Sequence, residues 1–222
     1  MDTHAEPAPP TQLTARFASA LELARRAHDG QLRKGTRIPY LSHPLAVAAL
    51  VLEHGADEDE AIAALLHDVV EDGGGRDALD AIRAEFGDRV ADIVLGCSDH
   101  VAEPGEVDRP KAEWRARKDA YLEHFLTADR SVLLVAAADK LHNARSIRDD
   151  YEVHGSLLWQ RFTAGPADVL WYFRSLVAVL QESVEDQAPG ATPDPTGYAR
   201  LVLELRRVVG EIDLMTWPDQ NA

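Results

Sequence analysis

Apolar residues along this chain recur at intervals of three and four, and alternation with a period of two is nowhere sustained. The pattern predicts helices over residues 11–28, 43–54, 57–71, 76–86, 88–96, 111–127, 130–147, 167–185 and 198–212. Ser42 is expected to cap the second helix and Asp57 or Asp59 the third, while Gly55 and the run 73–75 end them. The sequence therefore predicts an all-α bundle with little or no sheet.

The length and the composition fit one compact domain. A chain of 222 residues can bury one sizeable core. We expect residues 1–12, which are rich in proline and lack an apolar stretch, to form a disordered leader that is not a signal peptide. Residues 13–150 should form the core, and residues 151–222 should add helices that pack on the same domain.

The third predicted helix carries the most unusual chemistry in the chain. Residues 61–72 are apolar on nearly every side, yet the last two turns contain His67, Asp68, Glu71 and Asp72. On a continuous helix, His67 and Glu71 are four residues apart and share a face, as Asp68 and Asp72 do. Carboxylates buried without a partner are costly, and a divalent metal ion is the simplest remedy. An adjacent His-Asp pair can also arise by chance.

Two further apolar helices each carry a residue of the same kind. His43 stands at the start of the apolar segment 45–52, and Asp139 interrupts the apolar segment 131–141. Asp139 could instead be an ordinary ion-paired acid, because Lys140 follows it. Three apolar helices with one ligand-type position each favour a single inward-facing metal site.

The net charge of −15 argues against a nucleic-acid partner, because such a surface repels phosphates. The charge is distributed unevenly along the chain, however, since residues 25–37 contain five basic side chains and only one acidic one. Arg33 and Lys34, between Gly30 and Gly35, are predicted to form a loop near His43 that could gather a small polyanion. Arg25 and its neighbour read instead as a solvated helix face.

The chain gives no sign of export or of membrane insertion. Cys97 is the single cysteine, so no intrachain disulfide is possible and a reducing compartment is favoured. The longest apolar run, residues 132–138, is far too short to cross a bilayer. We expect a cytoplasmic protein, and the sequence leaves the oligomeric state open.

An ordered set of motifs matches a known family. The motifs are Ala-His28-Asp-Gly-Gln31, Arg33-Lys34, Pro39-Tyr40-Leu-Ser-His43-Pro44, Leu-Leu-His67-Asp68-Val-Val-Glu71-Asp72 and Ala-Asp139-Lys-Leu-His-Asn143-Ala-Arg145. Together they resemble the HD-type hydrolase domain of RelA/SpoT proteins and of stand-alone small alarmone hydrolases. The resemblance covers roughly residues 16–148.

The resemblance assigns roles to ten residues. It implies a metal site, for Mn²⁺ or another divalent ion, formed by His43, His67, Asp68 and Asp139. It implies that Glu71 and Asp72 orient or deprotonate the attacking water. It also implies nucleotide contacts from Arg33, Lys34, Asn143 and Ser146. Asp72 could alternatively cap a helix end or pair with Arg33 or Lys34.

The activity implied is the metal-dependent hydrolysis of the 3′-pyrophosphate of guanosine tetra- and pentaphosphate, which yields GDP or GTP and pyrophosphate. Ser146 replaces a threonine common in the family, and Ala144 replaces a larger apolar residue, so the base preference stays open. One alternative is hydrolysis of another nucleotide, such as an adenosine alarmone or an NADP-type 2′-phosphate. A further alternative is an HD module that binds nucleotide without catalysis.

Overall fold

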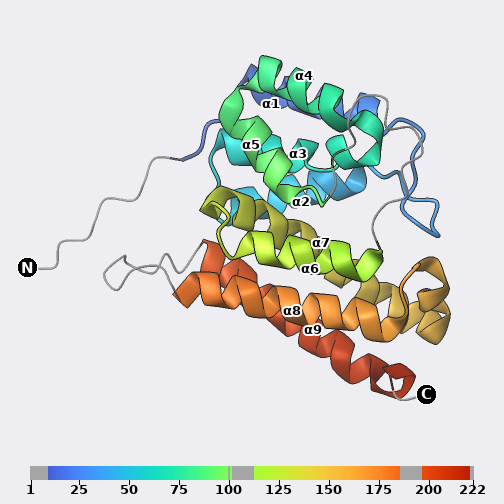
Figure 1. The fold of residues 1–222 in the computed structure, drawn as a ribbon. Coiled ribbons are helices and arrows are strands. Elements are labelled where there is room, and N and C mark those ends of the chain that lie inside the picture. The colour runs from blue at the N-terminus through green and yellow to red at the C-terminus, as the bar shows by residue number, and fades with distance from the viewer. Residues whose placement is uncertain (1–9, 100, 102–112, 186–196, 221–222) are drawn as a thin grey trace, which may run out of the picture.

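The structure, a computed structural model, describes residues 10–99, 101, 113–185 and 197–220, and these parts are almost entirely helical (Figure 1). The elements are α1 (Ala15–Ala27), α2 (Ser42–Glu53), α3 (Glu58–Leu66), the π-helix η1 (Val70–Gly74), α4 (Gly75–Phe86), α5 (Asp88–Cys97), α6 (Trp114–Phe125), α7 (Arg130–His154), the 3₁₀-helix η2 (Gly155–Arg161), α8 (Pro166–Glu185) and α9 (Tyr198–Gln220). Within the described residues, extended pairing is limited to one bridge between Leu32 and Pro39. The predicted all-α fold is confirmed.

Helix α7 is the centre of the bundle. It packs against α2, α3 and α5 on one side and against α8 and α9 on the other, as Figure 1 shows. Residues 131–139 of α7 are buried without interruption, so this half of the helix is surrounded by neighbours. Any polar side chain on it must therefore face a partner inside the protein.

Side-chain caps define several helix starts. Asp57 accepts a hydrogen bond from the backbone of Glu60, and the carboxylate of Glu60 accepts one from the backbone of Asp57, which completes a capping box. Asp129 caps α7 through the backbone of Ser131. The predicted cap by Ser42 is wrong, because α2 already includes Ser42 and its start has no side-chain cap.

The helix predicted over residues 57–71 is shorter than expected. Helix α3 ends at Leu66, residues 67–69 form a turn, and η1 follows as a π-helix. A π-helical turn widens the backbone and redirects its side chains, and such turns are frequent at functional sites. The regular four-residue relationship assumed for this segment is therefore wrong, although the side chains still gather, as described below.

The C-terminal helices are longer than the pattern predicted. Helix α7 continues to His154, η2 was not predicted, and α9 extends to Gln220. Buried residues of α8 and α9 belong to the same hydrophobic cluster as those of α2–α5. Most of the predicted leader, residues 1–9, lies outside the described residues, whereas the hydroxyl of Thr11 donates to the carbonyl of Ala56 over 2.7 Å. Among the described helices, none is both long and apolar enough to span a membrane.

Candidate active site

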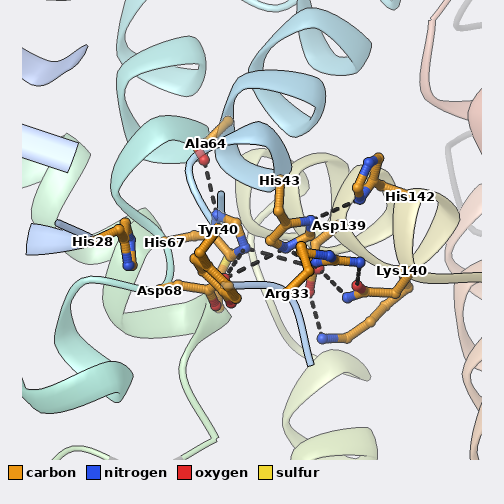
Figure 2. Close-up of polar contacts among 12 residues, drawn as sticks. His28, Arg33, Tyr40, His43, Ala64, His67, Asp68, Asp139, Lys140 and His142 are labelled. Atoms are coloured by element: carbon orange, nitrogen blue, oxygen red, sulfur yellow. Dashed lines mark hydrogen bonds and ion pairs between the residues drawn. The ribbon is translucent and has the colours of Figure 1, made fainter. Parts of the chain in front are cut away.

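The four predicted metal ligands converge from three segments of the chain (Figure 2). The Nε2 atom of His43, in the first turn of α2, lies 3.1 Å from Oδ1 of Asp139 on α7 and 3.4 Å from Oδ2 of Asp68. The Nε2 atom of His67 lies 3.2 Å from the same oxygen of Asp68 and 3.8 Å from Oδ1 of Asp139. Two imidazole nitrogens and two carboxylate oxygens thus lie close together, with Asp68 in contact with the two histidines.

The donor atoms fit a divalent cation. His67 places Nδ1 2.8 Å from the carbonyl of Ala64, so Nδ1 carries a hydrogen, and Nε2 of the neutral ring presents its lone pair. Nε2 is buried and makes no hydrogen bond within the described residues. His43, His67 and Asp139 each offer a ligand atom within 4.8 Å of the other two. A lone pair facing carboxylate oxygens is repulsive unless a cation lies between them, and these residues could hold one.

The electrostatics of the cluster also favour a cation. Burial lowers the pKa of His67, but Asp68 and Asp139 outweigh burial and raise this pKa to about 9. Burial raises the pKa of Asp139, but Lys140 and the two histidines hold it well below its usual value. The negative charge of Asp68 and Asp139, which favours the protonated form of His67, would equally attract a metal ion, because protons and metals compete for the same lone pairs.

Outer hydrogen bonds reach three of the four predicted metal ligands. The hydroxyl of Tyr40 donates to Oδ2 of Asp68 over 2.6 Å, and the amide of Asn143 donates to Oδ1 of Asp139 over 2.6 Å. Nδ1 of His142 lies 2.8 Å from Nδ1 of His43. Burial lowers the pKa of His142 to about 4, so at neutral pH it can accept the hydrogen from His43. Such outer contacts fix the direction and tautomer of metal ligands.

A small, almost wholly polar cavity of about 100 Å³ adjoins the ligands. It is lined by Tyr40, His43, Asp68, Glu71, Cys97, Asp99, Lys118, Tyr121, Asp139, Lys140 and Asn143. Burial, and next the charge of Asp99, raise the pKa of Glu71 to about 7. The second predicted acid, Asp72, has a side chain that lies outside the described part of the structure.

A larger cavity of about 670 Å³ adjoins the small one, and both are lined by Tyr40, Lys118, Lys140 and Asn143. All four predicted nucleotide contacts line it. The guanidinium of Arg33 donates to the amide oxygen of Asn143 over 3.2 Å and to the hydroxyl of Ser146 over 3.1 Å. The predicted loop residues therefore lie beside α7, although Arg33 is separated from Asn143 by 110 positions.

The walls of the larger cavity combine charge with apolar surface. Its basic side chains are Arg33, Lys34, Arg117, Lys118, Lys140 and Arg161, and its apolar and aromatic ones include Trp114, Leu158, Phe162 and Tyr172. A multiply phosphorylated molecule with a flat apolar part matches such a lining.

Sequence reasoning gave no role to several of these residues. Tyr40 is part of the sequence motif that contains His43, and its position three residues before His43 was a usable signal. Lys118 follows Arg115 and Arg117 in the sequence, and this concentration of basic residues was a usable signal. Asp99 and Arg161 gave no signal that periodicity or spacing could detect.

Comparisons with known proteins give matches that cover much of the chain. Residues 20–169 match the family model described as HD domain. The chain is 37% identical over 131 residues to a guanosine-3′,5′-bis(diphosphate) 3′-pyrophosphohydrolase of Haemophilus influenzae. It is 35% identical over 144 residues to the bifunctional (p)ppGpp synthase/hydrolase SpoT of Escherichia coli. These alignments cover 56% and 62% of this chain but 18% and 19% of the relatives, so the chain spans less than a fifth of their length.

Two solved structures are similar over most of the fold. One is described as a metazoan ortholog of SpoT that hydrolyses ppGpp; it has a TM-score of 0.66 and 25% identity, over 92% of this chain and 99% of that one. The other is a crystal structure of lmo0812 from Listeria monocytogenes, with a TM-score of 0.60 and 30% identity, over 77% and 97% of the two chains. Both matches extend across nearly the full length of the compared structure.

Proposed function

The chain belongs to the HD-domain family, and from that membership we propose that it is a metal-dependent phosphohydrolase of guanosine tetra- and pentaphosphate. The reaction releases the 3′-pyrophosphate intact and leaves GDP or GTP. The observation that carries this proposal is that a cavity of about 670 Å³ with several basic side chains shares four lining residues with the small cavity beside the His/Asp cluster. The relatives whose names state this reaction support the same substrate class.

His43, His67, Asp68 and Asp139 are the proposed metal ligands. Their mixture of imidazole nitrogen and carboxylate oxygen suits Mn²⁺ or a similar octahedral ion better than a thiolate-preferring one. When bound, such an ion lowers the pKa of a coordinated water and screens the phosphate charge.

The side chains around the two cavities would bind and orient the substrate. Lys118 and Lys140 stand where the cavities join, so we assign them to the pyrophosphate that is released. Arg33 and Lys34 line the outer part of the larger cavity with Asn143 and Ser146, and we assign these four to the nucleoside and its remaining phosphates. Apolar neighbours such as Phe162 would cover the base.

Glu71 and Asp72 are the proposed acid–base residues. Water attacks the phosphorus joined to the ribose 3′-oxygen, the bond between them breaks, and the 3′-oxygen must gain a proton. With a pKa near 7, Glu71 can hold or accept a proton at neutral pH, which is the property that proton transfer needs. Asp72 follows it directly on η1.

The wider assignments follow from the substrate. A nucleotide of this kind places the enzyme in the cytoplasm, and the net charge of −15 makes a nucleic-acid partner unfavourable. We assign catalysis to residues 13–150. Residues 151–222 would complete the wall of the larger cavity, because Leu158, Arg161 and Phe162 line it.

A product analysis tests the proposal. Purified protein loaded with Mn²⁺ is incubated with guanosine tetraphosphate, its adenosine counterpart and NADPH, and the products are separated by anion exchange. We expect GDP and intact pyrophosphate from the first substrate. Orthophosphate as the first product, from any of the three, would indicate a phosphomonoesterase of another nucleotide. Tight binding without turnover would indicate a binding module.

A further inference from the structure

Asp99, just beyond α5, is a buried carboxylate with no role in the assignments above. Its side chain is only 4% exposed, and Nζ of Lys118 lies 2.7 Å from its Oδ2. The guanidinium of Arg117 lies 3.1 Å from the same oxygen. The side chains of Arg117 and Lys118 thus hold the carboxylate of Asp99 in place. Asp99 lines the small cavity, Arg117 lines the larger one and Lys118 lines both, and the substrate would enter these cavities.

Asp99 also contacts the proposed acid–base residue. Its carboxylate lies within hydrogen-bonding reach of the carboxyl group of Glu71. Two carboxyl groups at that distance share one proton near neutral pH, because both cannot be charged side by side in a buried setting. Since Glu71 is on the five-residue π-helix η1, its side chain needs a tertiary contact to fix its direction.

We propose that Asp99 is a positioning residue that accepts a hydrogen bond from protonated Glu71 and anchors Lys118, so that both face the reacting phosphate. This inference rests on the proposed phosphohydrolase function and deepens it. Asp99 acts through Glu71 and Lys118. It determines where the proton of Glu71 lies and at which pH that proton leaves.

The charged surroundings of Glu71 define the expected direction of the change. Asp99 and Asp68 favour its protonated form, and Lys118 and Lys140 favour its ionised form. The other titratable groups on the same cavity are Tyr40, His43, Cys97, Tyr121 and Asp139. Replacing Asp99 by asparagine removes a negative charge and releases two cations, so the pKa of Glu71 must fall. Replacing Lys118 by methionine removes a positive charge, so the pKa must rise.

The test compares Asp99→Asn, Asp99→Glu and Lys118→Met with a control, Asp92→Asn. Asp92 lies on α5 and is an exposed acid paired with Arg83 over 2.8 Å, far from the cavity lining. The pH dependence of kcat is measured for each variant with guanosine tetraphosphate. We expect the apparent pKa that Glu71 contributes to the pH profile of kcat to fall by about one unit or more in Asp99→Asn and to rise in Lys118→Met. Asp99→Glu should restore most of the wild-type profile.

A second readout does not depend on turnover. The carboxyl resonance of Glu71 is titrated by ¹³C NMR in protein loaded with Mg²⁺, which is diamagnetic. The same downward and upward shifts are expected. If the wild-type enzyme cleaves no nucleotide, the proposed function is wrong, yet this titration still decides the role of Asp99. A Glu71 titration in Asp99→Asn and Lys118→Met that equals that of Asp92→Asn would overturn the inference.

Discussion

The hydroxyl of Tyr40 donates to Oδ2 of Asp68 over 2.6 Å, and this same oxygen lies 3.4 Å from Nε2 of His43 and 3.2 Å from Nε2 of His67. The ring of Tyr40 lies 4.9 Å from the buried ring of His28 and 6.0 Å from the guanidinium carbon of Arg33, centroid to atom. Tyr40 therefore connects the ligand cluster to the basic loop. A second connection runs from Arg33 through Asn143 to Asp139.

Tyr40→Phe should weaken metal binding without unfolding the protein. The substitution removes only the hydroxyl, so the ring contacts remain and Asp68 loses the partner that fixes its direction. Loss of such an outer hydrogen bond typically costs about 10- to 100-fold in metal affinity. Competition with a fluorescent chelator measures the change. Affinity equal to the wild type would show that the other contacts alone fix Asp68.

His67→Ala should abolish metal binding and lower the melting temperature of the metal-loaded preparation. The variant lacks one nitrogen ligand, and Asp68 and Asp139 keep their buried charges without the ion that would offset them. Elemental analysis after dialysis measures the metal content. His124→Ala, which removes an exposed histidine from α6, is the matched control. Full metal occupancy in His67→Ala would exclude this site.

The sequence predicted the convergence of the metal ligands but not the backbone that brings it about. His43, His67 and Asp139 each interrupt an apolar segment, and a polar residue in such a segment must face an interior partner, so their meeting was predictable. The end of α3 at Leu66 and the π-helix after it were not, because local periodicity cannot show where tertiary packing overrides helix propensity.

Contacts that form only when helices pack against one another could not be predicted from the sequence either. Asp99 reads as an ordinary polar residue after a helix, and only the approach of α6 gives it Lys118 as a partner. Arg161 lies in η2, which has no amphipathic repeat, yet it reaches the basic loop across the larger cavity. Such pairings depend on how helices dock, which spacing along one chain does not encode.

Lys34→Ala and Arg33→Ala should lower kcat/KM for guanosine tetraphosphate and leave the metal content unchanged. Both side chains line the larger cavity, and charge-assisted contacts to phosphate are stronger than neutral ones. We expect a loss of about tenfold or more for each variant. Arg26→Ala, on the exposed face of α1, should behave as the wild type. Wild-type kinetics for both loop variants would make the loop a solvated surface.

Gly35→Ala should raise KM, whereas Gly30→Ala should not. Both glycines have φ of +73°, so alanine at either position costs about 1 kcal/mol of backbone strain. A Cβ at Gly35 would lie 2.6 Å from Cδ of Arg161, but one at Gly30 would meet nothing within 4 Å. Comparing the two variants therefore separates the effect of backbone strain from the effect of displacing the loop that carries Arg33 and Lys34. Equal KM values in the two variants would mean that the Gly35–Arg161 contact does not position the loop.

Glu71→Gln should stabilise the protein in a pH-dependent way. Folding raises the pKa of Glu71 from its usual value to about 7, so the native state retains a proton that the unfolded chain releases. This opposes folding increasingly as the pH rises from about 4.5 to 7, because the unfolded carboxyl ionises first. Glutamine removes the effect. Thermal melting should therefore show no gain near pH 4.5 and a growing gain toward pH 7. A gain that is constant with pH would contradict the buried acid.

The same substitution should cost turnover while it improves stability. Glu71→Gln keeps the size of the side chain and can still donate to Asp99, so metal content and nucleotide affinity should stay near wild type. It cannot exchange a proton with the attacking water or the leaving 3′-oxygen, and a general acid or base is typically worth about 10² to 10⁴ in rate. Single-turnover assays with guanosine tetraphosphate measure the loss, with equilibrium binding of the nucleotide as the control. Undiminished turnover would remove Glu71 from the chemistry and leave the proton transfer to another group on the cavity wall.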